Sequence, residues 1–302
     1  MSHVLATGPV YNKPLSEGLL DIIINQRKTR LHFGYNFNQE VGELPEGVKK
    51  IFFGLKFKKS VDGLPDSLQL IHFCIDCEFN LPIVKLPAEL RYIHFGYAFN
   101  QEVDNCWRNC RNVKRIIFGH NFNKGVDNLP EGVEIIVFGS CFNSPVNFLP
   151  SSVQKLFFGT NFNQPLDNLP NRIKKIATGA CFQQSLDVLP DCVEKLELNQ
   201  GYNIPIKKWP ANLRVIALGE SYNNSIDNLP DGVEKIFMGA GFQQNINRLP
   251  KNIKHLNLSP FYKGKIGEIP STILFVRVYN TYQYLEELIA EVGVGKVIVL
   301  FP

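Results

Sequence analysis

Two closely spaced cysteine pairs are the residues of this sequence that are most able to do chemistry. Cys74 and Cys77 lie in "HFCIDCEF", and Cys106 and Cys110 lie in "NCWRNCRNV". A CxxC with a later CxxxC offers the thiolate ligands of a zinc site. One pair follows a predicted strand and the other precedes one, so we expect the pairs at opposite edges of a repeat. Loop insertions with buried or free thiols are therefore the preferred interpretation, with zinc as the alternative.

Three of the six histidines share one position in the sequence pattern. His32, His72 and His94 each follow directly after an apolar residue that is expected to point inward. With Cys74 nearby, these imidazoles could bind a metal ion. A simple column of surface histidines is the favoured interpretation.

No catalytic motif stands out from the rest of the sequence. The chain has no glycine-rich phosphate loop with a lysine and a hydroxyl residue before a helix, and no HExxH. The aspartates of "VDNLP", "LDNLP" and "IDNLP" recur at one fixed position, whereas an active site needs a single special arrangement. We therefore expect a protein that is not an enzyme and that needs no cofactor.

The composition indicates a folded, mildly basic protein. Of the 302 residues, 44% are apolar, and 32 lysines and arginines face 28 acidic residues, which does not single out a nucleic-acid binder. The cysteine number of seven is odd and no signal-peptide pattern opens the chain, so we expect an intracellular, cytoplasmic location. The longest apolar runs are far shorter than the roughly 20 residues of a membrane span.

An aromatic residue recurs at a nearly constant spacing along most of the chain, and nine of the eleven spacings are 20 residues. These anchor positions are Phe37, Phe57, Phe79, Phe99, Phe122, Phe142, Phe162, Phe182, Tyr202, Tyr222, Phe242 and Tyr262. A constant period of this length is typical of a solenoid, in which each coil buries its apolar face against its neighbours.

Each repeat has the pattern of one short strand followed by an arc. Fourteen residues after most anchors, and seventeen after Phe99, lies an aliphatic residue. We call these residues the core column: Ile51, Ile71, Ile93, Ile116, Ile136, Leu156, Ile176, Leu196, Ile216, Ile236 and Leu256. The segment "VQKLFFG" around Leu156 alternates like a strand and ends at a glycine, where we expect a sharp turn. Asparagines after the anchors, such as Asn163, are expected to bond to backbone groups of the arc.

The sequence resembles a known repeat family. "FNQPLDNLP", "FNSPVNFLP" and "YNNSIDNLP", each followed by a segment similar to "VQKLFFG", are similar to the FNIP repeat of social amoebae and of giant viruses that infect amoebae. The resemblance covers residues 31–278. It implies a mainly β, leucine-rich-repeat-like solenoid with a right-handed coil, about twelve repeats and one short parallel strand per coil. It also implies an interaction scaffold, acting in the host cell if the protein is viral.

The two ends of the chain depart from the repeat. We expect residues 1–30 to form an N-terminal cap with a short helix in "LSEGLLDIIINQ", and residues 279–302 to form a C-terminal helix and strand cap within a single domain. A partner-binding C-terminal helix is the alternative. Some relatives carry an N-terminal F-box that links them to a ubiquitin ligase. The N-terminal segment before the repeats of this chain is too short for an F-box, so a ubiquitin-ligase link would rest on the family resemblance alone.

The residues on either side of the core column should face outward, because side chains alternate along a strand. We call them the pre-core column, one residue earlier, and the post-core column, one residue later. Between Phe52 and Phe157 both columns are rich in apolar and aromatic residues, which predicts a protein-binding surface on the strand face. The predicted partner-binding residues are Phe52, His72, Tyr92, His94, Ile117, Ile135, Val137 and Phe157.

Two other binding functions remain open. The protein could self-associate through the same apolar patch or through the ends of the stack, as a structural or assembly component. Alternatively, Lys155, Lys175 and Lys195 of the pre-core column could bind an anionic partner, although Glu194 and Glu197 interrupt that basic field.

Overall fold

The structure is a computed structural model that describes residues 4–8, 11–42 and 44–301. The chain divides into two compact units, residues 1–154 (unit 1) and residues 155–302 (unit 2), and each is described by itself. Residues 1–3 and 9–10 of the predicted N-terminal cap, and Pro302 of the predicted C-terminal cap, lie outside the described residues.

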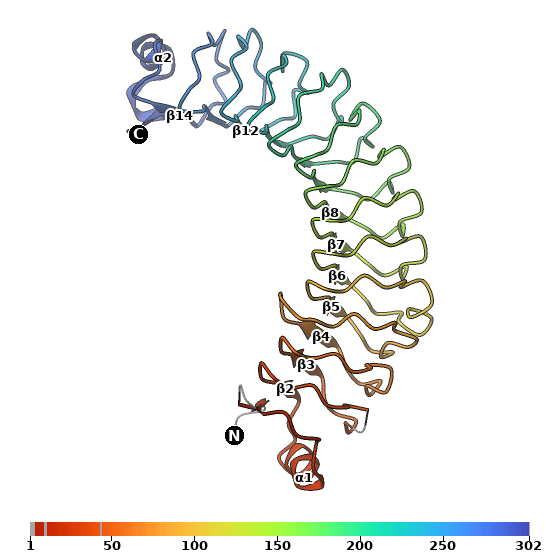
Figure 1. Ribbon diagram of the computed structural model, residues 1–302. Coiled ribbons are helices and arrows are strands. Elements are labelled where there is room, and N and C mark those ends of the chain that lie inside the picture. The colour runs from red at the N-terminus through yellow and green to blue at the C-terminus, as the bar shows by residue number, and fades with distance from the viewer. Residues whose placement is uncertain (1–3, 9–10, 43, 302) are drawn as a thin grey trace. The chain divides into compact units, whose positions relative to one another are not determined.

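In unit 1, successive strands pair in parallel and in sequence order (Figure 1). Its elements are β1 (Val4–Ala6), α1 (Glu17–Asn25), β2 (Arg30–His32), β3 (Lys50–Phe53), β4 (Leu70–Phe73), β5 (Tyr92–His94), β6 (Arg115–Ile117) and β7 (Ile135–Val137). The register places core-column residues side by side, as with Ile51 and Ile71.

Unit 2 continues the same pattern of parallel neighbours in sequence order. Its elements are β8 (Lys155–Phe157), β9 (Lys175–Ala177), β10 (Lys195–Glu197), β11 (Val215–Ala217), β12 (Lys235–Phe237), β13 (His255–Asn257), β14 (Phe275–Tyr279), α2 (Leu285–Val292), the 3₁₀ helix η1 (Val294–Lys296) and β15 (Val297–Leu300). The solenoid predicted from the repeat is therefore confirmed, with one short strand per coil.

The strands extend beyond the repeats that the sequence pattern identified. β2 to β13 are the twelve predicted strands, but β1 pairs with β2, and β14 continues the core column by pairing Val276 with Leu256. β15 then pairs with β14. β14 lies at the expected distance from the anchor Tyr262, with Val276 fourteen residues after it. β15 falls in the segment where the cap strand was expected, whereas β1 has no anchor before it and was not predicted.

A stack of buried aromatic rings forms the centre of each unit. In unit 1 the anchors from Phe37 to Phe142 are buried, and neighbouring ring centroids lie between 5.9 and 6.3 Å apart in near-parallel planes. In unit 2, Phe162, Phe182 and Tyr202 stack in the same way. Large rings contribute most of the apolar area that a coil buries, so this stack is a main source of stability.

Unit 1 has a second ring stack that unit 2 lacks. Phe33, Phe53, Phe73, Phe95, Phe118 and Phe138 form this stack, and each packs on the anchor that follows it, with centroids 3.8 to 4.5 Å apart. The equivalent positions in unit 2 after Phe158 are Thr178, Leu198, Leu218, Met238 and Leu258. The core of unit 1 is therefore the more aromatic of the two.

Side-chain amides link each coil to the next. The Oδ1 atom of Asn38 accepts from the backbone N–H of Lys58 (2.9 Å), and that of Asn80 accepts from Asn100 (2.8 Å). The contact recurs from Asn100 to Asn123, Asn123 to Asn143, Asn163 to Gln183, Asn203 to Asn223 and Asn223 to Gln243. The predicted bonding of these asparagines to arc backbone is confirmed, and the accepted N–H belongs to the following coil.

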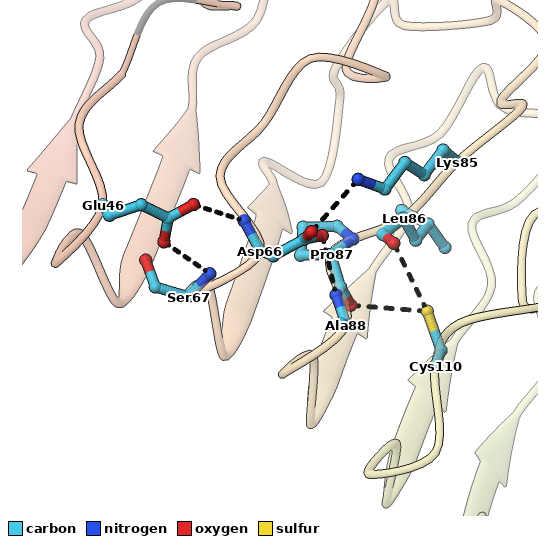
Figure 2. A network of polar contacts seen from close by, with 8 residues as sticks. All are labelled: Glu46, Asp66, Ser67, Lys85, Leu86, Pro87, Ala88 and Cys110. Carbon is cyan, nitrogen blue, oxygen red and sulfur yellow. Dashed lines mark hydrogen bonds and ion pairs between the residues drawn. The ribbon is translucent and has the colours of Figure 1, made fainter.

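Carboxylates make similar links on the arc (Figure 2). The carboxylate of Glu46 accepts from the backbone N–H groups of Asp66 (3.2 Å) and Ser67 (3.1 Å). One coil later, Asp66 accepts from the backbone N–H of Ala88 and from the Lys85 ammonium, each at 3.2 Å. These acidic residues satisfy backbone donors that the strands leave unpaired, which is a structural role.

The glycines that close the strands were predicted to allow a sharp turn, but the structure gives a different reason for them. Among the described glycines only Gly47 and Gly293 have a positive φ, so the strand-closing glycines do not need that conformation. A Cβ atom on Gly119 would instead lie 1.8 Å from the carbonyl oxygen of Gly96 in the preceding coil. Glycine is therefore required because backbones of adjacent coils approach closely there.

Short helices lie near both ends of the described chain. α1 lies within the segment where a helix was expected, and the Ser16 side chain accepts from the backbone N–H of Leu19 at its start. α2 ends before Gly293 and is followed by β15. The assignment of these segments as caps of a single domain stays a prediction. In the described part of the chain, neither helix has the length and apolar character of a membrane span.

Candidate protein-binding surface

The strand face of unit 1 has the alternation that the sequence predicted. In β2, β5 and β7 the central residue is buried and the two flanking residues are partly exposed. Pre-core and post-core residues therefore point away from the core, and the parallel register sets each beside its equivalent in the next strand.

Aromatic and imidazole rings form a continuous row along the post-core column. The His32 ring stacks on the Phe52 ring with centroids 4.1 Å apart, and Phe52 lies 5.5 Å from the next ring, His72. His72 and His94 follow at 4.6 Å, with their Nδ1 atoms 3.1 Å apart. At that distance one imidazole donates and the other accepts, so the contact requires at least one neutral ring. We call these four residues the ring row.

Ile117 and Val137 continue the same column on β6 and β7. Ile117 pairs with His94 on one side and with Val137 on the other. Both residues are partly exposed, like the ring row before them. The apolar surface therefore runs from β2 to β7.

The pre-core column supplies cations beside these rings. The Arg115 guanidinium lies 5.7 Å from the centroid of the Tyr92 ring, and the Arg30 guanidinium lies 5.7 Å from that of Phe52. Ile135 pairs with Arg115 in the next strand. No aspartate or glutamate occupies either column between β2 and β7. The face therefore combines apolar rings with positive charge.

Burial keeps the imidazoles of this face neutral. Desolvation lowers the pKa of His94 to about 4, with smaller contributions from His72 and Arg115. Desolvation also lowers the pKa of His72, with a smaller contribution from His32. It lowers the pKa of His32 in the same way, with a smaller contribution from Arg30. At neutral pH these rings are uncharged and behave as apolar contact surface.

One predicted binding residue lies in the other unit. Phe157 belongs to β8 in unit 2, where the Lys175 ammonium lies 4.8 Å from its ring centroid. Lys175 and Lys195 are both paired with Glu197, at 3.0 and 2.8 Å. The basic column considered for an anionic partner is therefore partly neutralised by a carboxylate of the same face.

The sequence reasoning missed an exposed apolar rim beside this face. Two residues before the anchors, unit 1 carries Tyr35 and Tyr97, and the Tyr97 ring stacks on the His120 ring at 4.4 Å. Tyr97 also donates its backbone N–H to Ile75, whose side chain is 72% exposed. Equivalent residues in unit 2 include Thr160, Ala180 and Gln200. The sequence signal for this rim was the presence of aromatic rings two residues before some anchors of unit 1, where unit 2 has residues without aromatic rings.

The four paired cysteines contact different parts of unit 1. Cys77 Sγ lies 3.2 Å from the Gly54 carbonyl oxygen, whereas Cys110 Sγ lies 3.4 Å from that of Pro87 (Figure 2). Over the residues that the structure describes, no cluster of three or more His, Cys, Asp or Glu side chains has a metal-binding arrangement. Cys77, Cys106 and Cys110 are buried and Cys74 is partly buried. The interpretation of these pairs as loop insertions with buried or free thiols, without a metal ion, stays a prediction.

Comparison with known proteins supports the repeat assignment. The family model of the FNIP Repeat matches residues 125–161 and 162–201. A search of curated proteins gave no match to the chain. Among solved structures, CroV588, a circular leucine-rich-repeat protein from a giant virus, is 26% identical, with a TM-score of 0.68 over 93% of this chain. The chain spans 50% of the length of CroV588.

A bacterial structure shows the same fold at lower similarity. YopM from Yersinia enterocolitica is 14% identical, with a TM-score of 0.51 over 86% of this chain and 67% of its own. The parallel strands, the leucine-rich-repeat neighbours and the two matched repeats agree with one another. Residues 125–201 of this chain contain FNIP repeats, and the chain has a leucine-rich-repeat-like solenoid fold.

Proposed function

We propose that this chain is a non-enzymatic scaffold that binds a protein partner on the strand face of unit 1. The observation that carries the proposal is the ring row, which presents four adjoining rings on one face, with no carboxylate in either outward column between β2 and β7. Leucine-rich-repeat-like proteins commonly act as interaction scaffolds, and strand faces are the extended surfaces that such repeats offer.

The chemistry of the face defines the kind of partner. The neutral rings and the aliphatic residues Ile117 and Val137 suit an apolar or aromatic segment, because burying such surface is favourable. Arg30, Lys50 and Arg115 suit acidic residues around that segment, since complementary charge speeds association and selects partners. The proposed partner is therefore a protein that presents apolar side chains flanked by acidic ones.

Paired substitutions on the two units test the proposal. The test variant carries Phe52→Asp and Ile117→Asp, which place carboxylates in the face of unit 1. The matched control carries Ala217→Asp and Phe237→Asp in the same column of unit 2. Both variants are first compared with the wild type by thermal unfolding, because only variants of unchanged stability report on binding.

The readout is affinity capture from a lysate of the cell in which the protein naturally occurs, with proteins identified by mass spectrometry. A partner that is lost with the unit 1 variant and kept with the unit 2 control supports the proposal. Equal capture by both variants contradicts it and moves the binding site away from this face.

Sedimentation of the purified chain tests the self-association alternative. A wild-type oligomer that the unit 1 variant converts to a monomer would identify a second copy as the occupant of the face. A wild-type monomer leaves the face available for a different protein.

A further inference from the structure

Cys74 and Cys77 lie in one tight turn of unit 1. The turn directly follows β4, and the backbone N–H of Cys77 donates to the carbonyl of Cys74 at 3.0 Å. Residues that close a turn in this way have Cα atoms within about 7 Å of each other. A disulfide spans Cα separations of about 4.4 to 6.8 Å, so the turn already brings the two thiols within bonding range.

The two thiols have different surroundings. Cys77 is fully buried, and its Sγ lies 3.2 Å from the carbonyl oxygen of Gly54 and 3.8 Å from that of Phe57. From the other side, a Cβ atom on Gly96 would lie 2.6 Å from the Cys77 Cβ. Cys77 is therefore held between two coils, whereas Cys74 is only partly buried and remains accessible.

Hydrogen bonding separates the acidities of the pair. The Cys77 thiol donates a hydrogen bond to the Cys74 sulfur, which lowers the pKa of Cys74 to about 7. The backbone N–H groups of Asp76 and Cys77 also lower this pKa, whereas burial and the Asp76 carboxylate raise it. The same hydrogen bond, together with burial, raises the pKa of Cys77. Near pH 7 a substantial fraction of the accessible Cys74 sulfur is therefore thiolate, whereas the buried Cys77 is a thiol.

The second cysteine pair provides an internal comparison. Cys106 and Cys110 are both buried, and their Sγ atoms lie 3.1 Å from the Val103 carbonyl oxygen and 3.4 Å from that of Pro87. Burial raises the pKa of Cys106 and raises the pKa of Cys110 to about 12. Neither offers an accessible thiolate, so both should be inert toward electrophilic sulfur.

We propose that Cys74 and Cys77 form a redox-active dithiol that undergoes reversible exchange with low-molecular-weight disulfides. The Cys74 thiolate attacks one sulfur of the small disulfide, whose S–S bond breaks, giving a mixed disulfide on Cys74 and one free thiolate. Cys77 then attacks the Cys74 sulfur, and its proton passes to the departing small thiolate, which leaves as the second thiol. The protein dithiol is oxidised to a disulfide, and the small disulfide is reduced to two thiols.

Oxidation changes the contact between the coils as well as the turn. In the dithiol state the single Cys77 proton can be donated either to the Cys74 sulfur or to the Gly54 carbonyl oxygen 3.2 Å away, and in the disulfide state that donor no longer exists. The carbonyl would lose a protein partner at a position where the coils are closely packed. The redox state of the turn therefore affects the packing between the coils of β3 and β4.

The test uses the full-length wild-type protein and oxidised glutathione as the small disulfide. The protein is incubated near pH 7 in buffers of varied glutathione ratio, quenched with acid, alkylated and digested for mass spectrometry. The expected result is a Cys74–Cys77 disulfide that reduced glutathione reverses, while Cys106 and Cys110 remain alkylatable thiols. Failure of the first pair to oxidise, or equal oxidation of both pairs, would overturn the proposal.

Variants separate the two roles within the pair. With Cys77→Ser the reaction should stop at glutathione bound to Cys74, and with Cys74→Ser the buried Cys77 should take up no glutathione. Cys106→Ser is the matched control and should still form the Cys74–Cys77 disulfide. Glutathione uptake by Cys77 in the Cys74→Ser protein would show that the accessible thiolate has been assigned to the wrong residue.

A measurement on the wild type needs no variant to fold. The rate of Cys74 alkylation is followed against pH, peptide by peptide. A midpoint near pH 7 is expected from its lowered pKa. A midpoint near 8.5, the ordinary value for a cysteine thiol, would contradict the proposed activation.

Discussion

Individual side chains determine how the strand face of unit 1 responds to pH. His94 has a folded-state pKa of about 4, below the ordinary histidine value of about 6.5. Between these two values the unfolded chain binds more protons than the folded chain, so stability is retained above pH 6.5 and falls as the pH decreases. Acidification should therefore weaken unit 1 before its carboxylates titrate.

Removing the titrating group should reduce this sensitivity. Gln at position 94 keeps polar contact with His72 but cannot take up a proton. We expect the melting temperature of His94→Gln to fall less than that of the wild type between about pH 7.5 and pH 5. Thermal unfolding followed by circular dichroism at each pH provides the measurement. Parallel pH profiles for the two proteins would show that His94 does not control the transition.

Neighbouring residues of one strand should differ sharply in their contribution to stability. Ile136 is fully buried in the core column, so Ile136→Ala should cost about 2 to 5 kcal/mol through lost burial and a cavity. Val137 points outward, and Val137→Ala should cost about 0.5 kcal/mol or less. Denaturant unfolding of both variants measures the difference. Similar losses would show that the inward and outward faces have been exchanged.

At the scale of the element, the turn after each strand limits which residue can stand there. A methyl group at Gly119 would overlap the backbone of the preceding coil, and a backbone atom cannot move aside like a flexible side chain. Gly119→Ala should therefore destabilise unit 1 by about 1 to 3 kcal/mol or more. Gly125 is the matched control, because a Cβ atom there meets nothing within 4 Å.

Denaturant unfolding of both glycine variants tests this explanation. Gly125→Ala should be neutral or slightly stabilising, since alanine restricts the unfolded chain more than glycine does. A comparable loss in both variants would point to backbone conformation rather than close approach as the reason for glycine.

Most of the elements could be predicted from the sequence because each coil repeats the same short-range pattern. The core column marked β3 to β13, and alternation around residues such as Ile93 gave the direction of the flanking side chains. β15 lies where the strand of the C-terminal cap was expected, whereas β1 was missed because it pairs with β2 without carrying the repeat. Strand-closing glycines were assigned to turns because close approach between coils depends on the stacking distance, which a single coil does not reveal.

The candidate surface could be predicted only in part, because contacts between neighbouring coils are not visible in the sequence of one coil. The outward direction of Phe52 and His72 follows from alternation, but their ring contacts depend on side-chain geometry across strands. The pairing of Lys175 with Glu197 also joins different strands, so it was not visible in one repeat. The acidity of Cys74 depends on a hydrogen bond from Cys77, which spacing alone does not establish.

At the scale of the whole molecule, the coils interact chiefly with their neighbours in sequence. In such repeat proteins stability approximates a sum of coil and nearest-neighbour terms, so damage should stay local. Ile216→Ala removes a fully buried residue from β11. We expect faster amide hydrogen exchange in β10 to β12 and unchanged exchange in β2 to β4.

Hydrogen exchange followed by mass spectrometry distinguishes local from global loosening. Val215→Ala changes the outward neighbour on the same strand and serves as the control, with little effect expected in either region. An equal rise in exchange in β2 to β4 and in β10 to β12 of the Ile216→Ala protein would show that the chain opens as a single cooperative body.

The links made by asparagine and carboxylate side chains also have a direction. In the asparagine links and in the links of Glu46 and Asp66, the acceptor belongs to the earlier coil and the backbone donor to the later one, as from Asn38 to Lys58 and from Glu46 to Asp66. During synthesis the earlier coil leaves the ribosome first, so its acceptors are available when the next coil emerges. The nascent chain can therefore fold from its N-terminal side one coil at a time, with each finished coil acting as the template for the next.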